Sequence, residues 1–167
     1  METFRKTPRP VISQTENNTT LWIGHPSFDS SDHWAGQTFV CPSAGQIDNI
    51  QVFSAAVPSP GELTLSLHEF DEQSRSWGPA IASTQQSIDK GDESKWFRFK
   101  LDPMQLEKNK TYGFRLHSSD AFVGLGEAVS FAKNPFEFGL SWNGDNNDQK
   151  GKYFNYFSLA FKVELRA

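Results

Sequence analysis

The stretch FSLAFKVEL, residues 157–165, decides the fold class of this chain. Large apolar side chains occupy every second position, which is the period of a β-strand with one buried face. Because a shift of one residue would turn the whole apolar set to water, we predict a strand whose register is firmly fixed. The set that we expect to face the core is Phe157, Leu159, Phe161, Val163 and Leu165.

The same alternation recurs upstream, in the stretches 62–70, 94–101 and 111–118. Turns rich in Gly and Pro separate these stretches, and no long helical period is present. We therefore predict an all-β chain, a single antiparallel jelly-roll-like β-sandwich over residues 21–167, preceded by an N-terminal arm or edge segment over residues 1–20. The inward set of these three stretches is Leu63, Leu65, Leu67, Phe97, Phe99, Leu101, Tyr112, Phe114 and Leu116.

Composition and charge bound the classes of function. The 167 residues carry a formal net charge of −4, so no basic face for nucleic acid is expected. The single cysteine, Cys41, excludes an internal disulfide and is expected to be a buried structural thiol. No apolar run is long enough for a membrane span or a signal peptide. We expect a soluble protein, cytoplasmic by default unless a leader has been removed.

Four pieces of the sequence carry a family resemblance. They are GQTFVCPSAGQIDNIQVF (36–53), GELTLSLHEF with WGPAIAS (61–83), WFRFKLDPMQLEKNKTYGFRL (96–116) and NPFEFG with YFSLAFKV (134–163). Together they resemble the jelly-roll-like β-sandwich modules, similar to carbohydrate-binding modules, of bacterial extracellular and glycan-active proteins. The resemblance rests on core and turn positions. It implies a β-sandwich fold and, by analogy, carbohydrate binding or surface attachment.

Sequence motifs for catalysis fail their context tests. GLSWN (139–143) begins like a nucleophile elbow but ends in Asn143 rather than Gly, and GLGEAV (124–129) lacks the surrounding βαβ unit of a dinucleotide site. The four histidines show no metal-ligand spacing, and His68 and His117 are predicted on outward strand faces. We expect a protein that is not an enzyme and that has no cofactor and no metal.

The polar stretch that follows Trp142 allows two interpretations. Asn143, Asp145, Asn147 and Asp148 carry oxygen ligands that calcium prefers, but the spacing does not match an EF-hand. Asp and Asn are also the ordinary residues of turns, because they bond their own backbone. We favour a wide solvated turn and keep a structural calcium as the alternative.

Aromatic residues beside polar stretches give the leading hypothesis for function. Trp77 is predicted in the polar loop 71–79, and Trp142 and Tyr153 flank the polar stretch that follows β-type sequence. An exposed Trp forgoes roughly 2 kcal/mol of burial, so it either caps the end of the sandwich or stacks on a ligand such as a sugar ring. We predict a non-catalytic module that binds carbohydrate. Its predicted site comprises Trp77, Trp142 and Tyr153 as stacking surfaces and Asn143, Asp145 and Arg75 as polar partners.

An alternative function remains open at this point. The alternative is a structural or protein-interaction β-sandwich without a small-molecule ligand, with a homodimer that pairs an aromatic sheet face as one form of it. The predicted partners are accordingly a glycan or a second copy of the chain, with no nucleic acid and no membrane.

Overall fold

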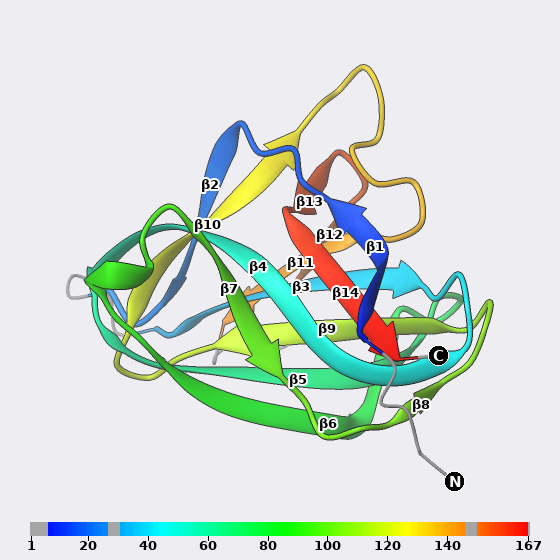
Figure 1. Ribbon diagram of the computed structural model, residues 1–167. Coiled ribbons are helices and arrows are strands. Elements are labelled where there is room, and N and C mark those ends of the chain that lie inside the picture. The colour runs from blue at the N-terminus through cyan, green and yellow to red at the C-terminus, as the bar shows by residue number, and fades with distance from the viewer. Residues whose placement is uncertain (1–6, 27–30, 146–149, 167) are drawn as a thin grey trace, which may run out of the picture.

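The computed structural model describes residues 7–26, 31–145 and 150–166, which form an all-β chain without an α-helix (Figure 1). A 3₁₀ helix, η1 (Lys90–Asp92), interrupts the strands once. The strands are β1 (Arg9–Gln14), β2 (Thr19–Gly24), β3 (His33–Val40), β4 (Gly45–Ser59), β5 (Gly61–Asp71), β6 (Ser76–Ile88), β7 (Lys95–Lys100), β8 (Gln105–Leu106), β9 (Thr111–His117), β10 (Phe122–Val129), β11 (Ser141–Asp145), β12 (Lys152–Phe154), β13 (Phe157–Leu159) and β14 (Phe161–Arg166).

Antiparallel pairing joins these strands into one large curled sheet. Its main path runs β1-β14-β4-β10-β2-β3-β9-β5-β6, and the remaining strands attach at its sides. The long strand β4 sweeps around the molecule in Figure 1, so that it pairs with β14 and β7 along its first part and with β10 near its end. The curl brings two layers face to face. One is β6-β5-β9-β3-β11-β12, and the other is built on β1-β14-β4-β7.

The core lies between these two layers and confirms the alternation of the sequence. Leu159, Phe161, Val163 and Leu165 are at most 1% exposed. Leu63, Leu65 and Leu67 of β5 are fully buried as predicted, and so are Phe114 and Leu116 of β9. Burying such side chains contributes roughly 2 kcal/mol each, which explains why the register of these strands is fixed.

The terminal strand differs from the prediction in two ways. It is divided at Ala160 into β13, which pairs with β10, and β14, which pairs with β4. Phe157 is only half-buried, in a surface cluster with Phe154 and Tyr156, whereas Ser158 on the opposite face is fully buried. The change of partner strand at Ala160 is the reason, because it ends the simple alternation between an inner and an outer face.

The segment predicted as an N-terminal arm or edge segment contains a strand at the edge of the sheet. β1 pairs with β14 at one end of the main path, and a register shift separates Pro10 from Ile12. Pro10 has no N–H to give to a ladder, which suits a strand at the end of a sheet.

Within the described part of the chain, no helix has the length and apolar character needed to cross a membrane.

Candidate functional site: an aromatic groove on the outer sheet face

The candidate site lies on the outer face of the layer that contains β3, β5 and β9. Because Phe114 and Leu116 point into the core, the intervening side chain of Arg115 points outward, and so does position 113. The partner strand β3 places Gly36 directly opposite Arg115 in register. This face therefore carries a guanidinium flanked by glycines, which leaves room for large rings.

The indole of Trp77 fills that room. A Cβ atom added at Gly113 would lie 2.6 Å from Cζ3 of Trp77, and one added at Gly36 would lie 3.3 Å from Cη2 of Trp77. Trp77 belongs to β6 and pairs with Phe70 of β5. Two register shifts interrupt the β5–β6 pairing between Leu67 and Phe70. Such shifts bend a hairpin, and here the bent tip lies over β9 and β3.

A chain of hydrogen bonds holds the hairpin tip in place. Nε1 of Trp77 donates to the hydroxyl of Tyr153 at 2.9 Å, and that hydroxyl donates to the carbonyl of Arg75 at 3.1 Å. The guanidinium of Arg75 lies 5.5 Å from the centre of the Tyr153 ring. The tip of the β5–β6 hairpin is thereby tied to β12, which comes from the far end of the chain.

Arg115 lies in the corner between two indole rings. Its guanidinium carbon is 4.3 Å from the ring centre of Trp77 and 4.6 Å from that of Trp142, and the two rings meet edge to face. Both contacts are within the range of cation–π attraction. Nε of Arg115 is buried without a hydrogen-bond partner among the described residues. Burial also lowers the pKa of the Arg115 guanidinium, and the Coulombic effect of Tyr153 opposes this only in part.

Two histidines beside Arg115 are held neutral. Burial lowers the pKa of His68, and the positive charge of Arg115 lowers it further, although a bond to the carbonyl of Gly78 opposes both. His117 stacks on Trp34 with 4.4 Å between ring centres, and burial is again the main reason for its lowered pKa. The predicted outward position of both histidines is confirmed, and Arg115 supplies the positive charge between them.

Trp77, Arg115 and Tyr153 border an open groove of about 640 Å³. A smaller hollow of about 260 Å³ lies on the other side of Trp77, along Glu69, Asp71 and Lys110. Clefts of several hundred Å³ that combine ring faces with a few polar groups are typical of small-ligand sites. The groove is lined by Ser74, Arg75, Ser76, Trp77, Gly78, Arg115, Lys150, Gly151 and Tyr153.

Three of the predicted site residues meet in this groove. Trp77 and Tyr153 are half-buried with part of each ring accessible, and Arg75 is exposed at the rim. Trp77 lies on β6 rather than in a loop, because β6 begins at Ser76. The sequence thus identified both rings of the groove, although they are 76 positions apart.

The structure places the other three predicted residues elsewhere, which corrects the prediction. Trp142 is fully buried, and its Nε1 donates to the carbonyl of Lys150 at 2.9 Å, so its ring supports the groove from below and has no face for a ligand. Asn143 shares the inner face with its neighbour in register, Ala35, and its Oδ1 is buried. Asp145 lies at the end of β11, opposite His33. All three belong to β11, and Asn143 and Asp145 lie where the sequence predicted a wide turn.

The structure bears on the calcium alternative for this stretch through two of its four candidate ligands. Asn143 and Asp145 belong to the ladder between β3 and β12, whereas Asn147 and Asp148 lie outside the described residues. Among the residues that the structure describes, no group of three or more His, Cys, Asp or Glu side chains converges in a way that could hold a metal ion.

Sequence analysis did not identify Arg115 or its two flanking glycines. The signal was present, because the alternation of TYGFRLHS assigns positions 113 and 115 to the outward face. What the sequence did not show is that a bent hairpin tip covers that face. Without this contact, Arg115 looks like an ordinary solvent-facing cation.

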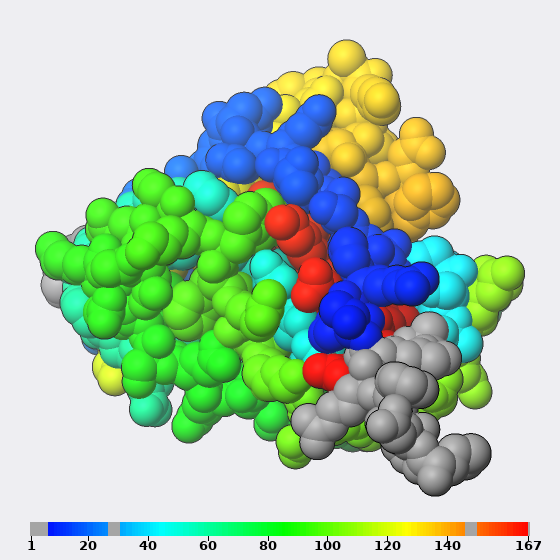
Figure 2. Space-filling model, viewed as in Figure 1, coloured from blue at the N-terminus to red at the C-terminus, as the bar shows by residue number. Residues whose placement is uncertain are grey.

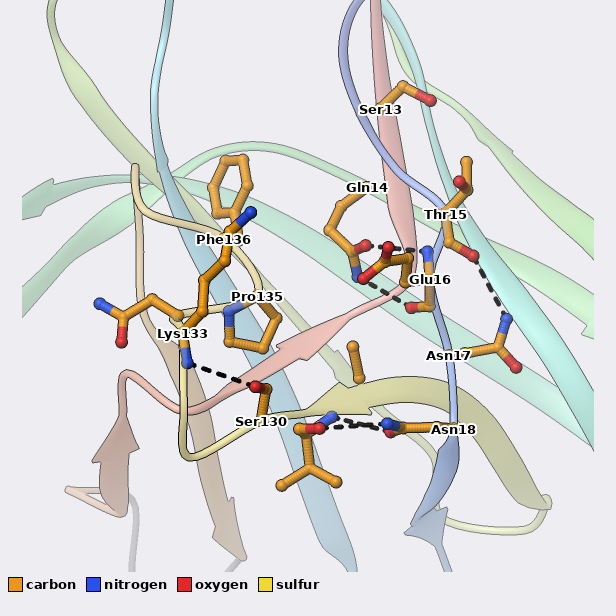
Figure 3. A pocket seen from close by; sticks show the side chains of 13 residues that line it. Ser13, Gln14, Thr15, Glu16, Asn17, Asn18, Ser130, Lys133, Pro135 and Phe136 are labelled. Carbon is orange, nitrogen blue, oxygen red and sulfur yellow. Dashed lines mark hydrogen bonds between the residues drawn. The ribbon is translucent and has the colours of Figure 1, made fainter.

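A second hollow, of about 840 Å³, lies between the β1–β2 and β10–β11 connections (Figure 3). Figure 2 shows these two segments, in blue and in yellow to orange, side by side at the surface. Two of its amides, those of Gln14 and Asn18, are already used by the fold. Gln14 donates to the carbonyls of Glu16 and Leu159, and Asn18 exchanges two hydrogen bonds with the backbone of Val129. The aromatic groove is the stronger candidate because the Nε donor of Arg115 there has no partner among the described residues.

Comparison with known proteins supports the fold and leaves the function open. No protein-family model matches the chain, and no curated protein sequence matches it. A solved structure that is similar contains the cysteine protease and lectin-like domains of Cwp84, a surface layer associated protein of Clostridium difficile. The sequences are 11% identical and the TM-score is 0.50; the match covers 82% of this chain and 33% of that one. The matched part is the lectin-like domain and not the protease domain. The match thus spans about a third of that chain, and the fold of this chain is similar to that of its lectin-like domain.

Proposed function

We propose that this protein is a non-catalytic carbohydrate-binding module and that the groove beside Trp77 and Tyr153 is its binding site. The observation that carries the proposal is the open groove itself, in which two partly accessible rings stand among polar and cationic side chains. Sugar rings have apolar C–H faces that pack on aromatic rings, and neighbouring donors bond their hydroxyl groups. The lectin-like fold and a jelly-roll arrangement of the two layers are consistent with this role.

The groove is prepared for binding before a ligand arrives. Trp77 is fixed by its hydrogen bond to Tyr153, by the buried ring of Trp142 and by Arg115. A ring that is already held in one orientation loses little conformational entropy on binding, which favours affinity.

A glycan array followed by calorimetric titration tests the proposal. We expect Trp77→Ala to weaken binding on the order of tenfold or more, as for a central aromatic contact. The matched control is Trp22→Ala, because Trp22 is 44% exposed on β2 and stacks on Phe122, away from the groove. Near-ultraviolet circular dichroism of both variants checks the fold. Absence of binding to any glycan, or equal loss in both variants, would reject the site.

A second candidate function is self-association, and one surface feature favours it. Phe131 is 84% exposed and lies against Tyr156, which also contacts Phe154 and Phe157. Contiguous exposed rings are typical of interaction surfaces. Sedimentation velocity of the wild type and of Phe131→Ser separates the two functions, because a dimer through this cluster would dissociate in the variant while glycan binding would persist.

A further inference from the structure

We infer that the groove selects acidic sugars and that Arg115 is the residue that binds their carboxylate. This inference rests on the proposed function and adds to it the class of the ligand. It starts from the charge of the groove, which is opposite to that of the chain. The chain carries −4, whereas Arg75, Arg115 and Lys150 line the groove, and none of its described lining residues carries a carboxylate.

Among the residues that the structure describes, Arg115 has no counterion. The structure gives it no ion pair and no hydrogen bond with any described residue, and its Nε is buried. A partly buried charge is ordinarily paired, because the loss of hydration must be offset by a partner. The buried carboxylate of Asp48 follows that rule, since it bonds both Lys100 and Arg166 at 2.7 Å. The unpaired state of Arg115 therefore points to a partner that arrives with the ligand.

The surroundings of Arg115 fit a planar anion. Two indole rings hold the guanidinium by cation–π contacts, and its buried Nε has no hydrogen-bond acceptor among the described residues. A guanidinium presents its N–H donors in one plane as a fork that matches the two oxygens of a carboxylate. The neighbouring histidines have lowered pKa values, so they add no positive charge of their own beside Arg115. Beside this point, Trp77 and Tyr153 offer the ring surface for the sugar that carries the carboxylate.

The experiment compares one ligand in two chemical states. A linear uronic-acid oligosaccharide and the same oligosaccharide with its carboxyl groups reduced to primary alcohols are titrated into the wild-type protein by calorimetry, at low and at high ionic strength. We expect the acidic form to bind at least about tenfold more tightly, with a difference that shrinks as salt is added. This comparison needs no variant, so it stays valid even if substitutions at Arg115 impair folding.

Two variants then assign the effect to Arg115. Arg115→Met should remove the preference for the acidic form, and Arg115→Lys should restore it in part, because a lysine keeps the charge and loses the planar fork. The matched control is Arg98→Met, since Arg98 is exposed on β7 in the other layer.

The outcomes separate the inference from the function on which it rests. Equal affinity for the acidic and the reduced oligosaccharide would overturn the acidic preference and leave carbohydrate binding intact. Unchanged preference in Arg115→Met would overturn the role of Arg115. Failure of both oligosaccharides and of the wider glycan array would overturn the proposed function as well.

Discussion

The indole nitrogen of Trp77 donates a hydrogen bond to the hydroxyl of Tyr153 across 2.9 Å, and this single contact joins β6 to β12. The Tyr153 hydroxyl in turn donates a hydrogen bond to the carbonyl of Arg75. Because the hairpin tip covers Gly113 and Gly36, its attachment determines whether the groove exists. The architecture and the candidate site are therefore coupled through Tyr153.

Tyr153→Phe tests this coupling. The substitution keeps the ring and removes the oxygen that accepts from Trp77 and donates to Arg75. Since a typical hydrogen bond contributes about 1 kcal/mol, we expect a loss of that size in the free energy of unfolding. Urea denaturation measures the loss, and a rise in acrylamide quenching would show the freed indole of Trp77. Unchanged stability together with unchanged quenching would mean that other contacts hold the hairpin tip.

Gly113→Ala tests the space beneath Trp77. The new methyl group would meet Cζ3 and Cη2 of Trp77 at 2.6 Å and 2.8 Å, closer than van der Waals contact allows. We expect the indole to move, glycan binding to fall, and the far-ultraviolet spectrum of the sheet to stay as it is. Gly91→Ala, at an exposed residue of η1, is the control. A crystal structure of the variant with Trp77 unmoved would contradict the expectation.

From the buried carboxyl of Glu127 we predict that the protein loses stability as the pH rises toward neutral. Its carboxyl shares the core-facing side of β10 with Val123 and Leu125, is 4% exposed, and has its pKa raised to about 7 by burial. A pKa that is higher in the folded than in the unfolded state gives stability that is fully present below the unfolded pKa. That stability is lost as the pH rises through the folded pKa.

Glu127→Gln should therefore raise the stability near neutral pH, by at most roughly 3 kcal/mol, and should leave it nearly unchanged below the ordinary pKa of a glutamate. Thermal melts across the acidic to neutral range measure the difference, with the exposed Glu72→Gln as control. A variant that is destabilised near neutral pH and not in acid would show instead that Glu127 is needed in its charged form.

From the paired carboxylate of Asp48 we predict the opposite dependence of stability on pH. Burial opposes its charge, but hydrogen bonds from Lys100, Asn49 and Arg166 outweigh this effect and lower its pKa to about 2. A lowered pKa gives stability that is present above the unfolded pKa and lost as the pH falls through the folded one. Asp48→Asn should cost roughly 2 kcal/mol at neutral pH and little in strong acid. Urea denaturation at several pH values measures this, and equal behaviour of the exposed control Asp102→Asn would contradict it.

The sequence predicted the all-β core well, because burial acts on each strand separately. The alternation of Leu63, Leu65 and Leu67 needs no knowledge of neighbouring strands, since any partner sheet would bury the same face. The alternation alone was misleading around Ala160, where the chain changes its partner strand. Ser158 is buried there, although the alternation placed it on the outward face.

The candidate site was predicted only in part, because it depends on contacts between distant segments. Aromatic type and polar neighbours identified Trp77 and Tyr153. Nothing in the sequence showed that β11 inserts between β3 and β12, which buries Trp142 beneath the groove. Arg115 was missed for the same reason, since its surroundings come from the β5–β6 hairpin and from β11.

The most direct measurement of the central claim follows the tryptophan side chains during a glycan titration. The chain has five tryptophans, whose indole N–H groups give separate signals in a proton–nitrogen correlation spectrum. We predict that the signal of Trp77, assigned by its absence in Trp77→Phe, shifts most as an oligosaccharide is added, while that of Trp22 stays in place. A bound glycan that moves Trp22 and leaves Trp77 unshifted would contradict the account.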